Sequence, residues 1–84
     1  MLALYLTLLE SDRERELFLQ AYQAYDRSLH YVARRILGSE DLAQDAVQET
    51  WYVVCKNFEK FLSIPCQKRR AWVVIIVKNL ALNM

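Results

Sequence analysis

The sequence predicts an all-α fold, a compact bundle of three to four helices formed by residues 1–84 as a single domain. One glycine and one proline leave little material for the tight turns that a sheet requires. Apolar residues make up 55% of the chain, enough for one modest core and too many for a disordered chain. In the longer segments they recur every three or four residues, which is typical of amphipathic helices.

The first ten residues are apolar and favour a short helix, with Leu2, Leu6 and Leu9 on one face. We expect this face to pack against the rest of the domain or against a second copy of the chain. The run lacks the basic start and the small-residue cleavage site of a signal peptide. Uncharged runs in the chain are also shorter than the roughly 20 residues of a membrane helix. We therefore expect a cytoplasmic protein with no membrane partner.

A long helix is predicted to begin after Ser11. Residues 11–14 (SDRE) match the capping box, in which the serine oxygen accepts from the third amide and the glutamate reaches back. The apolar positions that follow are spaced by fours and threes and would pack along a second helix. They are Phe18, Tyr22, Tyr25, Leu29, Val32 and Ile36. His30 lies beside this stripe, and we interpret it as a packing residue because no catalytic partner accompanies it.

Residues 36–60 contain a helix stop followed by a second long helix. Gly38 can adopt the left-handed conformation that ends a helix, and Ser39 can cap the free amides of the next one. One apolar stripe then continues to the end of this segment, so we expect a single helix up to Lys60. The stripe is formed by Ala43, Ala46, Val47, Thr50, Trp51, Val54, Phe58 and Phe61.

Another face of this helix carries a compact acidic and amide patch. Asp45, Gln48 and Glu49 lie three and four residues apart, so we expect them side by side at the surface. The patch is either a surface for a partner or an ordinary solvated helix face. The spacing alone favours the solvated face.

A loop is predicted at residues 61–66, before the last segment of the chain. Pro65 is suited to the first turn of a further helix. Residues 73–77 are β-branched and on their own are typical of a buried strand. A strand needs a partner, however, and no other segment shows a strand pattern. We therefore predict a helix, supported by the helical spacing of Trp72, Ile76, Asn79, Leu80 and Asn83.

Charge is distributed unevenly along the chain. Residues 1–55 carry five basic and nine acidic side chains, a net charge of −4. Residues 56–84 carry six basic side chains and one acidic side chain, a net charge of +5. An acidic half and a basic half suggest two partners of opposite charge.

The sequence contains no pattern that indicates an enzyme or a metal protein. Cys55 and Cys66 are too far apart for a CxxC pair, and the single histidine rules out a four-ligand zinc set of the usual spacing. We expect two reduced cysteines, no metal and no cofactor. A nucleophile with a base, a paired-carboxylate site and a phosphate loop are also missing, so we predict that the protein is not an enzyme.

Two blocks of the sequence resemble region 2 of bacterial RNA polymerase sigma factors, most closely the extracytoplasmic-function group. The first block is ILGSEDLAQDAVQETW, with DAVQE at residues 45–49. The second is RRAWVVIIVKNLAL, with RAW at residues 70–72 and KNLA at residues 78–81. The resemblance covers about residues 17–83, with both blocks in the family's order and separation. It implies a compact helical bundle that serves in transcription initiation.

The resemblance also implies two binding surfaces. Asp45, Gln48 and Glu49 would dock on the clamp helices of the polymerase β′ subunit, where carboxylates pair with Arg and Lys. The basic end would hold the non-template strand of the minus-ten promoter element and help to melt the duplex. The residues implied for this DNA contact are Lys56, Lys60, Phe61, Lys68, Arg69, Arg70, Trp72, Lys78 and Asn79. The cations would meet phosphates, Phe61 an unstacked base, and Asn79 a base edge, while Trp72 is either a DNA contact or a core residue.

Three positions depart from the family pattern. Ile75 stands where many members carry arginine, Val77 replaces an alanine, and Cys55 replaces a common tryptophan. The basic surface of the last helix is therefore thinner than usual, which reduces the DNA binding that we expect. We also expect the second family domain to be absent, namely the helix-turn-helix region 4 that reads the minus-thirty-five element.

One alternative function stays open. The same helices could form an interaction module that binds a regulatory partner, such as an anti-sigma protein, or a second copy of the chain, without contacting DNA. The apolar first ten residues and the run at 73–77 favour this alternative, because a small bundle has limited capacity to bury them. Binding to polymerase would discriminate between the two functions.

Overall fold

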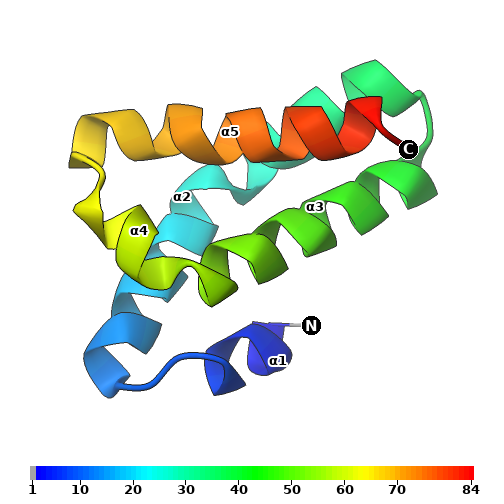
Figure 1. Cartoon of the computed structure of the whole chain (residues 1–84). Coiled ribbons are helices and arrows are strands. Elements are labelled where there is room, and N and C mark those ends of the chain that lie inside the picture. The colour runs from blue at the N-terminus through cyan, green and yellow to red at the C-terminus, as the bar shows by residue number, and fades with distance from the viewer. Residues whose placement is uncertain (1) are drawn as a thin grey trace.

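The computed structural model describes residues 2–84, which form five α-helices and no strand. These are α1 (Leu2–Thr7), α2 (Asp12–Leu37), α3 (Glu40–Lys56), α4 (Phe58–Ser63) and α5 (Cys66–Leu82). The long helices α2, α3 and α5 pack against one another, α4 connects α3 to α5, and α1 lies beside α3 on the side away from α5 (Figure 1). The predicted all-α bundle is confirmed.

The start of α2 follows the predicted capping box with one difference. The Ser11 hydroxyl oxygen accepts a hydrogen bond from the backbone amide of Glu14 at 3.1 Å, as expected. The Glu14 carboxylate, however, accepts from the backbone amide of Glu10 at 3.0 Å, one residue before the expected partner. The carboxylate therefore ties down the connection that leads from α1 into α2.

The helix α1 is held against the body of the domain. The side chains of Tyr5 and Leu9 are buried, and the Tyr5 hydroxyl donates to the backbone carbonyl of Gln48 in α3 at 3.1 Å. The Arg15 guanidinium donates to the carbonyls of Leu6 and Leu9 at 3.1 and 3.0 Å. The prediction that the first ten residues pack on the domain is confirmed, although the deepest residue of α1 is Tyr5 rather than a predicted leucine.

The turn between α2 and α3 is built as the sequence predicts. Gly38 has a left-handed φ of 67°, and its backbone N–H donates to the carbonyl of Arg34 at 2.9 Å. The Ser39 hydroxyl oxygen then accepts from the amide of Leu42 at 3.3 Å. An ion pair between Arg34 and Glu40, with N···O at 2.8 Å, spans the same turn.

The prediction of one helix up to Lys60 is wrong. The helix α3 ends at Lys56, and Asn57 separates it from α4. The Asn57 side-chain amide donates to the carbonyl of Val53 at 2.9 Å, a local bond with which asparagine competes against helix continuation. Because α4 extends to Ser63, the loop predicted at residues 61–66 shrinks to residues 64 and 65.

The core is a cluster of aromatic rings around Phe18 of α2, which is fully buried. Its ring meets Trp51 of α3 edge to face, with centroids 5.4 Å apart. The rings of Tyr5 in α1 and Phe58 in α4 complete the cluster, at 5.8 and 6.2 Å from Phe18. One residue of α2 thus joins four of the five helices that the structure describes.

A polar contact accompanies this cluster. The indole N–H of Trp51 donates to Asp26 Oδ1 at 2.9 Å, so the buried ring keeps a hydrogen bond. The other oxygen of Asp26 lies 3.5 Å from Nε2 of His30, which is half-buried. His30 is therefore a packing residue, as predicted.

The helix α5 confirms the helical interpretation of the β-branched run. Val73, Val77 and Ala81 are four residues apart and buried, so they form the face that packs on α2 and α3. Pro65 immediately precedes the helix, one position before the predicted one. Across residues 2–84, no helix combines the length and the apolarity that crossing a membrane would require.

We predict that Gly38→Ala lowers the free energy of unfolding by about 1 kcal/mol, because an alanine is strained in the left-handed region. A Cβ at this position would meet no neighbouring atom within 4 Å, so the loss would come from the backbone alone. Urea denaturation followed by tryptophan fluorescence measures the change. Gly38→Asn is the control and should lose less, because asparagine tolerates this conformation. Equal stability of all three proteins would contradict the prediction.

Candidate functional site

The predicted acidic patch lies on the outer face of α3. Asp45 and Glu49 are exposed, and Gln48 is half-buried. The ion pairs found within residues 2–84 involve Asp12, Asp26 and Glu40, so neither Asp45 nor Glu49 has an intramolecular cation. The two carboxylates lie at the surface as expected, and Gln48 is only partly exposed there. Gln48 lines a second hollow together with Tyr22, Asp26 and His30 of α2, and its backbone carbonyl accepts from Tyr5.

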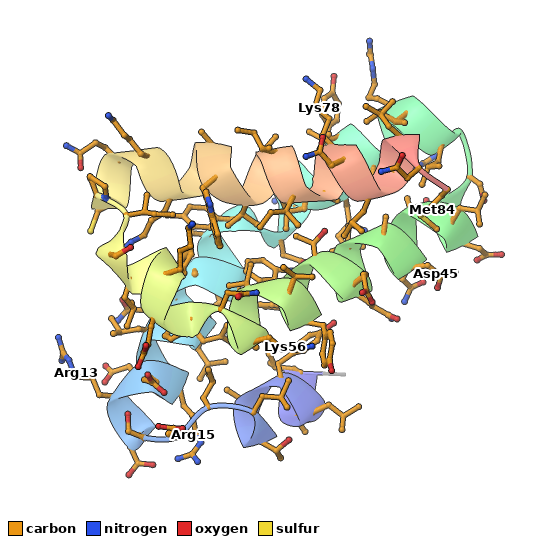
Figure 2. The ribbon with its side chains drawn as sticks, viewed as in Figure 1. Arg13, Arg15, Asp45, Lys56, Lys78 and Met84 are labelled. Atoms are coloured by element: carbon orange, nitrogen blue, oxygen red, sulfur yellow. The ribbon has the colours of Figure 1, made fainter. Side chains whose placement is uncertain are left out.

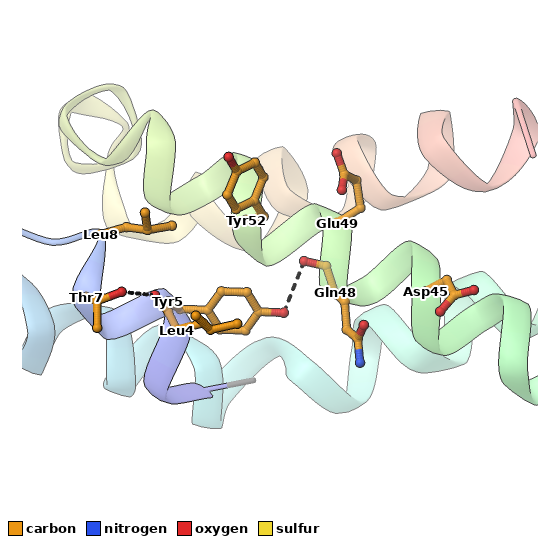
Figure 3. A pocket seen from close by; sticks show the side chains of 8 residues that line it. All are labelled: Leu4, Tyr5, Thr7, Leu8, Asp45, Gln48, Glu49 and Tyr52. Atoms are coloured by element: carbon orange, nitrogen blue, oxygen red, sulfur yellow. Dashed lines mark hydrogen bonds between the residues drawn. The ribbon is translucent and has the colours of Figure 1, made fainter.

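A groove of about 380 Å³ runs between α1 and α3 beside this patch (Figure 3). It is lined by Leu4, Tyr5, Thr7, Leu8, Asp45, Gln48, Glu49 and Tyr52. The patch therefore forms one side of a hollow whose other side is α1. The sequence analysis did not find the contribution of α1. The sequence does contain a signal for it, because residues 2–9 are apolar on all faces of the helix. One face alone can be buried, so Leu4 and Leu8 remain outside the buried face.

Two groups near this groove have strongly raised pKa values. The pKa of the Tyr5 phenol is raised to about 12, mainly by burial and in smaller amounts by the nearby Tyr22, Cys55, Asp26 and Glu49. Burial also raises the pKa of the Cys55 thiol to about 12. Both groups therefore keep their protons near neutral pH.

The predicted DNA-binding cations do not form one surface. Lys68, Lys78 and Asn79 are exposed on the outer side of α5, and Ile75 is exposed between them. Arg70 is also exposed, with its guanidinium 5.7 Å from the ring centroid of Tyr25 in α2. The helix α5 therefore presents three cations and one amide that are free to meet a ligand.

Lys56 and Lys60 lie apart from this set, at the junction of α3 and α4. They border a hollow that also contains the carboxylates of Glu10, Glu14 and Glu59. The ammonium of Lys56 in addition lies 5.1 Å from the ring centroid of Tyr52. Figure 2 shows Lys56 on α3 and Lys78 near the far end of α5. The neighbouring carboxylates offset the positive charge of this pair, so it is less suited to phosphate than the cations of α5.

Phe61 is not available to a DNA base in this structure. Its side chain is 1% exposed, and its ring stacks on Phe58 with centroids 5.4 Å apart. The Phe61 ring also packs on Trp72, with ring centroids 5.9 Å apart, and Trp72 is half-buried. The prediction that Phe61 contacts an unstacked base is therefore not supported, because the bend at Asn57 turns this residue into the core.

Arg69 has an internal structural role. Its guanidinium lies 5.2 Å from the ring centroid of Phe61. It also donates to the carbonyls of Leu62 and Ile64, both at 2.9 Å. These carbonyls belong to the end of α4, where helical partners are lacking. Arg69 therefore closes the turn between α4 and α5, with two of its N–H groups donating within the domain.

Cysteine and metal chemistry contribute no further site within the described residues. Cys55 is buried and Cys66 is exposed, and both are free thiols. Within residues 2–84, no group of three His, Cys, Asp or Glu side chains is placed to hold a metal ion. The candidate site consists of the acidic face of α3 and the exposed cations of α5.

The comparison with protein families identifies the family of the chain. Residues 21–84 match the model of the sigma-70 region 2 family, which covers most of the chain. The chain therefore belongs to the sigma-70 region 2 family and is a sigma factor domain with a role in transcription initiation and promoter recognition. Searches among curated proteins and among solved structures gave no match.

We predict that the domain loses stability as the pH rises above 9. Tyr5 and Cys55 have ordinary pKa values of 10.0 and 9.0, and both rise to about 12 in the folded domain. The unfolded chain therefore releases these protons first, so the stabilisation is complete below pH 9 and is lost between pH 9 and about 12. Each group contributes a slope of up to about 1.4 kcal/mol per pH unit.

Urea denaturation at several values from pH 8 to pH 11 tests this dependence. Tyr5→Phe and Cys55→Ala each remove one titrating group, so each variant should show a shallower fall of the free energy of unfolding with pH. The experiment compares how steeply the free energy of unfolding falls with pH. The free energy itself is not compared, because Cys55→Ala also lowers it at every pH by leaving a cavity. Identical slopes in all three proteins would contradict the assignment.

Proposed function

We propose that this domain docks on the clamp helices of the β′ subunit of RNA polymerase through α3 and binds the non-template strand of the minus-ten element through α5. Contact with the separated strand would help to melt the duplex. The observation that carries the proposal is the pair of unneutralised carboxylates, Asp45 and Glu49, on an exposed face of a sigma-70 region 2 domain. Both partners are cytoplasmic, and we propose the same compartment for the domain.

The acidic face suits a basic protein helix. Asp45 and Glu49 lie four residues apart, so they are about one helical turn from each other. Arginine forms charge-assisted, often bidentate hydrogen bonds with such carboxylates. Gln48 lies between them and supplies an amide for a directional contact at the edge of the same face. Negative charge here would repel DNA, which assigns this surface to the protein partner.

The outer side of α5 suits a single DNA strand. We assign the phosphate contacts to Lys68 and Lys78 on the outer side of α5, and to Arg70, which is exposed at the start of the helix beside Tyr25 of α2. Asn79 is exposed on the same helix and carries the donor and acceptor needed to read a base edge. Trp72 is half-buried and offers part of its ring for stacking. Arg69 and Phe61 act behind this surface by fixing the start of α5.

A second candidate partner for the α3 face is an anti-sigma protein or another copy of the chain. Leu4 on α1 and Leu8 just after it favour this candidate, since both are large apolar residues left exposed. Under this alternative the domain would be an interaction module, and binding to the β′ clamp helices would be absent.

We predict that Asp45→Lys combined with Glu49→Lys reduces the affinity for a β′ clamp-helix fragment at least tenfold, which corresponds to about 1.4 kcal/mol. The reason is charge reversal at the centre of the proposed interface. Gln48 is kept, because it is half-buried and its carbonyl holds Tyr5. Isothermal titration calorimetry measures the affinity, and circular dichroism checks the fold.

The matched control is Glu16→Lys combined with Glu59→Lys, which makes the same charge change at two exposed positions outside the α3 face. This control should retain most of the binding. If the two double variants bind equally well, net charge rather than the α3 face governs binding, and the docking assignment is wrong.

We also predict weak, salt-dependent binding of a single-stranded minus-ten oligonucleotide. Replacing Lys68, Arg70 and Lys78 by glutamine should reduce the slope of log affinity against log salt by about 2, because each phosphate contact on a single strand contributes roughly 0.7. Fluorescence anisotropy at several salt concentrations gives this slope. Lys56→Gln with Lys60→Gln is the comparison and should change it less. A flat salt response of the unsubstituted domain would rule out the phosphate contacts.

A further inference from the structure

Large exposed apolar side chains gather along the groove between α1 and α3. Leu4, Leu8 and Tyr52 are 62%, 43% and 40% exposed, and all three line the groove. Figure 3 shows Leu4 on α1 and Leu8 just after its end, with Tyr52 on α3 opposite them. Isolated apolar residues on a surface are ordinary, but a group of them around one hollow is typical of a binding site.

The charge around the groove is one-sided. Residues 2–9 of the α1 segment carry no charged side chain. The α3 wall carries the carboxylates of Asp45 and Glu49, which have no cation among the described residues. A complementary partner therefore presents an apolar side chain toward α1 and basic side chains toward α3. An amphipathic helix with Arg or Lys beside an apolar residue has this arrangement.

The walls of the groove are already in place without a partner. Tyr5 forms its base, 3% exposed, and its hydroxyl reaches the carbonyl of Gln48 across the groove at 3.1 Å. At the end of α1, Arg15 binds the carbonyls of Leu6 and Leu9. Contacts at the middle and at the C-terminal end of α1 hold this helix in its orientation, so a partner would lose little free energy in ordering it.

We propose that α1 forms the second wall of the polymerase-docking site. Leu4 and Leu8, together with Tyr52, accept an apolar side chain from a helix of the polymerase. Basic residues on the neighbouring turns of that helix pair with Asp45 and Glu49. This inference rests on the proposed function and extends it, because docking then depends on an apolar contact from outside the matched family segment, which begins at residue 21.

Charge argues for a polymerase helix rather than a second copy of this chain. A symmetric dimer brings the same surface patch of both copies together. Asp45 and Glu49 of one copy would then lie close to the same carboxylates of the other, and like charges across an interface are unfavourable. A basic helix from another protein avoids this repulsion.

The test compares two double variants for binding to the β′ clamp-helix fragment. Leu4→Gln with Leu8→Gln should reduce affinity at least tenfold and leave the salt dependence of binding unchanged, because it removes only apolar contact. Asp45→Lys with Glu49→Lys should reduce both the affinity and its salt dependence. Ile75→Gln with Leu82→Gln is the matched control, because these apolar residues are also exposed but lie on α5. This control should bind like the unsubstituted domain.

A further variant distinguishes loss of the apolar contact from detachment of α1, since either would weaken binding in the leucine variant. Tyr52→Gln changes the opposite wall and leaves the contacts of α1 with Gln48 and Arg15 intact, so it should also weaken binding. Circular dichroism and thermal unfolding check the fold of each variant.

The outcomes separate this inference from the proposed function. If the leucine variant and Tyr52→Gln bind normally while the charge-reversal variant does not, the docking face is correct and the role of α1 is wrong. If the unsubstituted domain does not bind the fragment, the proposed function fails and this inference with it. Leucine-dependent dimerisation of the domain in sedimentation experiments would assign the groove to a second copy and overturn the proposal.

Discussion

The packing of Phe18 against Trp51 fixes the rotation of α3 relative to α2, and both proposed surfaces depend on that rotation. The two rings meet edge to face at 5.4 Å, and the indole N–H is satisfied by Asp26 at 2.9 Å. Leaving such a buried donor unpaired costs about 1–3 kcal/mol, so few other rotations of α3 are acceptable. With Trp51 pointing inward, Asp45 and Glu49 on the other side of the helix must point outward.

The same arrangement keeps the acidic and the basic surfaces apart. The groove lies between α3 and α1, whereas α5 packs on the other side of α3 (Figure 1). Exposed charges separated by more than about 8 Å are largely screened at physiological ionic strength. A domain built this way can meet a basic protein helix and a negatively charged DNA strand at once, because the carboxylates near the groove do not oppose the phosphates near α5.

Two residues that the family resemblance implied for DNA contact, Arg69 and Phe61, have structural contacts within the domain. Arg69 would be an obvious phosphate contact, yet its donors close the turn after α4 by binding Leu62 and Ile64. The Phe61 ring lies against that guanidinium and packs on Trp72. The first turn of α5 is thereby fixed, and Lys68 and Arg70 are presented from a rigid helix. The smaller number of free cations on α5, with Ile75 exposed among them, agrees with the thin basic surface expected from the sequence.

The sequence by itself determined the features that depend on neighbours in the chain. Gly38 and Ser39 end one helix and start the next through bonds within four residues, and the apolar stripes identify the buried faces of α2 and α3. For α5 the helical spacing predicted the helix but not its buried face, which consists of Val73, Val77 and Ala81. The tertiary structure alone decided that α3 breaks at Asn57, that Phe61 is buried, and that α1 lies beside the acidic face. Periodicity shows which residues share a face, but burial and partner choice depend on contacts between segments far apart in the chain, such as Tyr5 with Gln48.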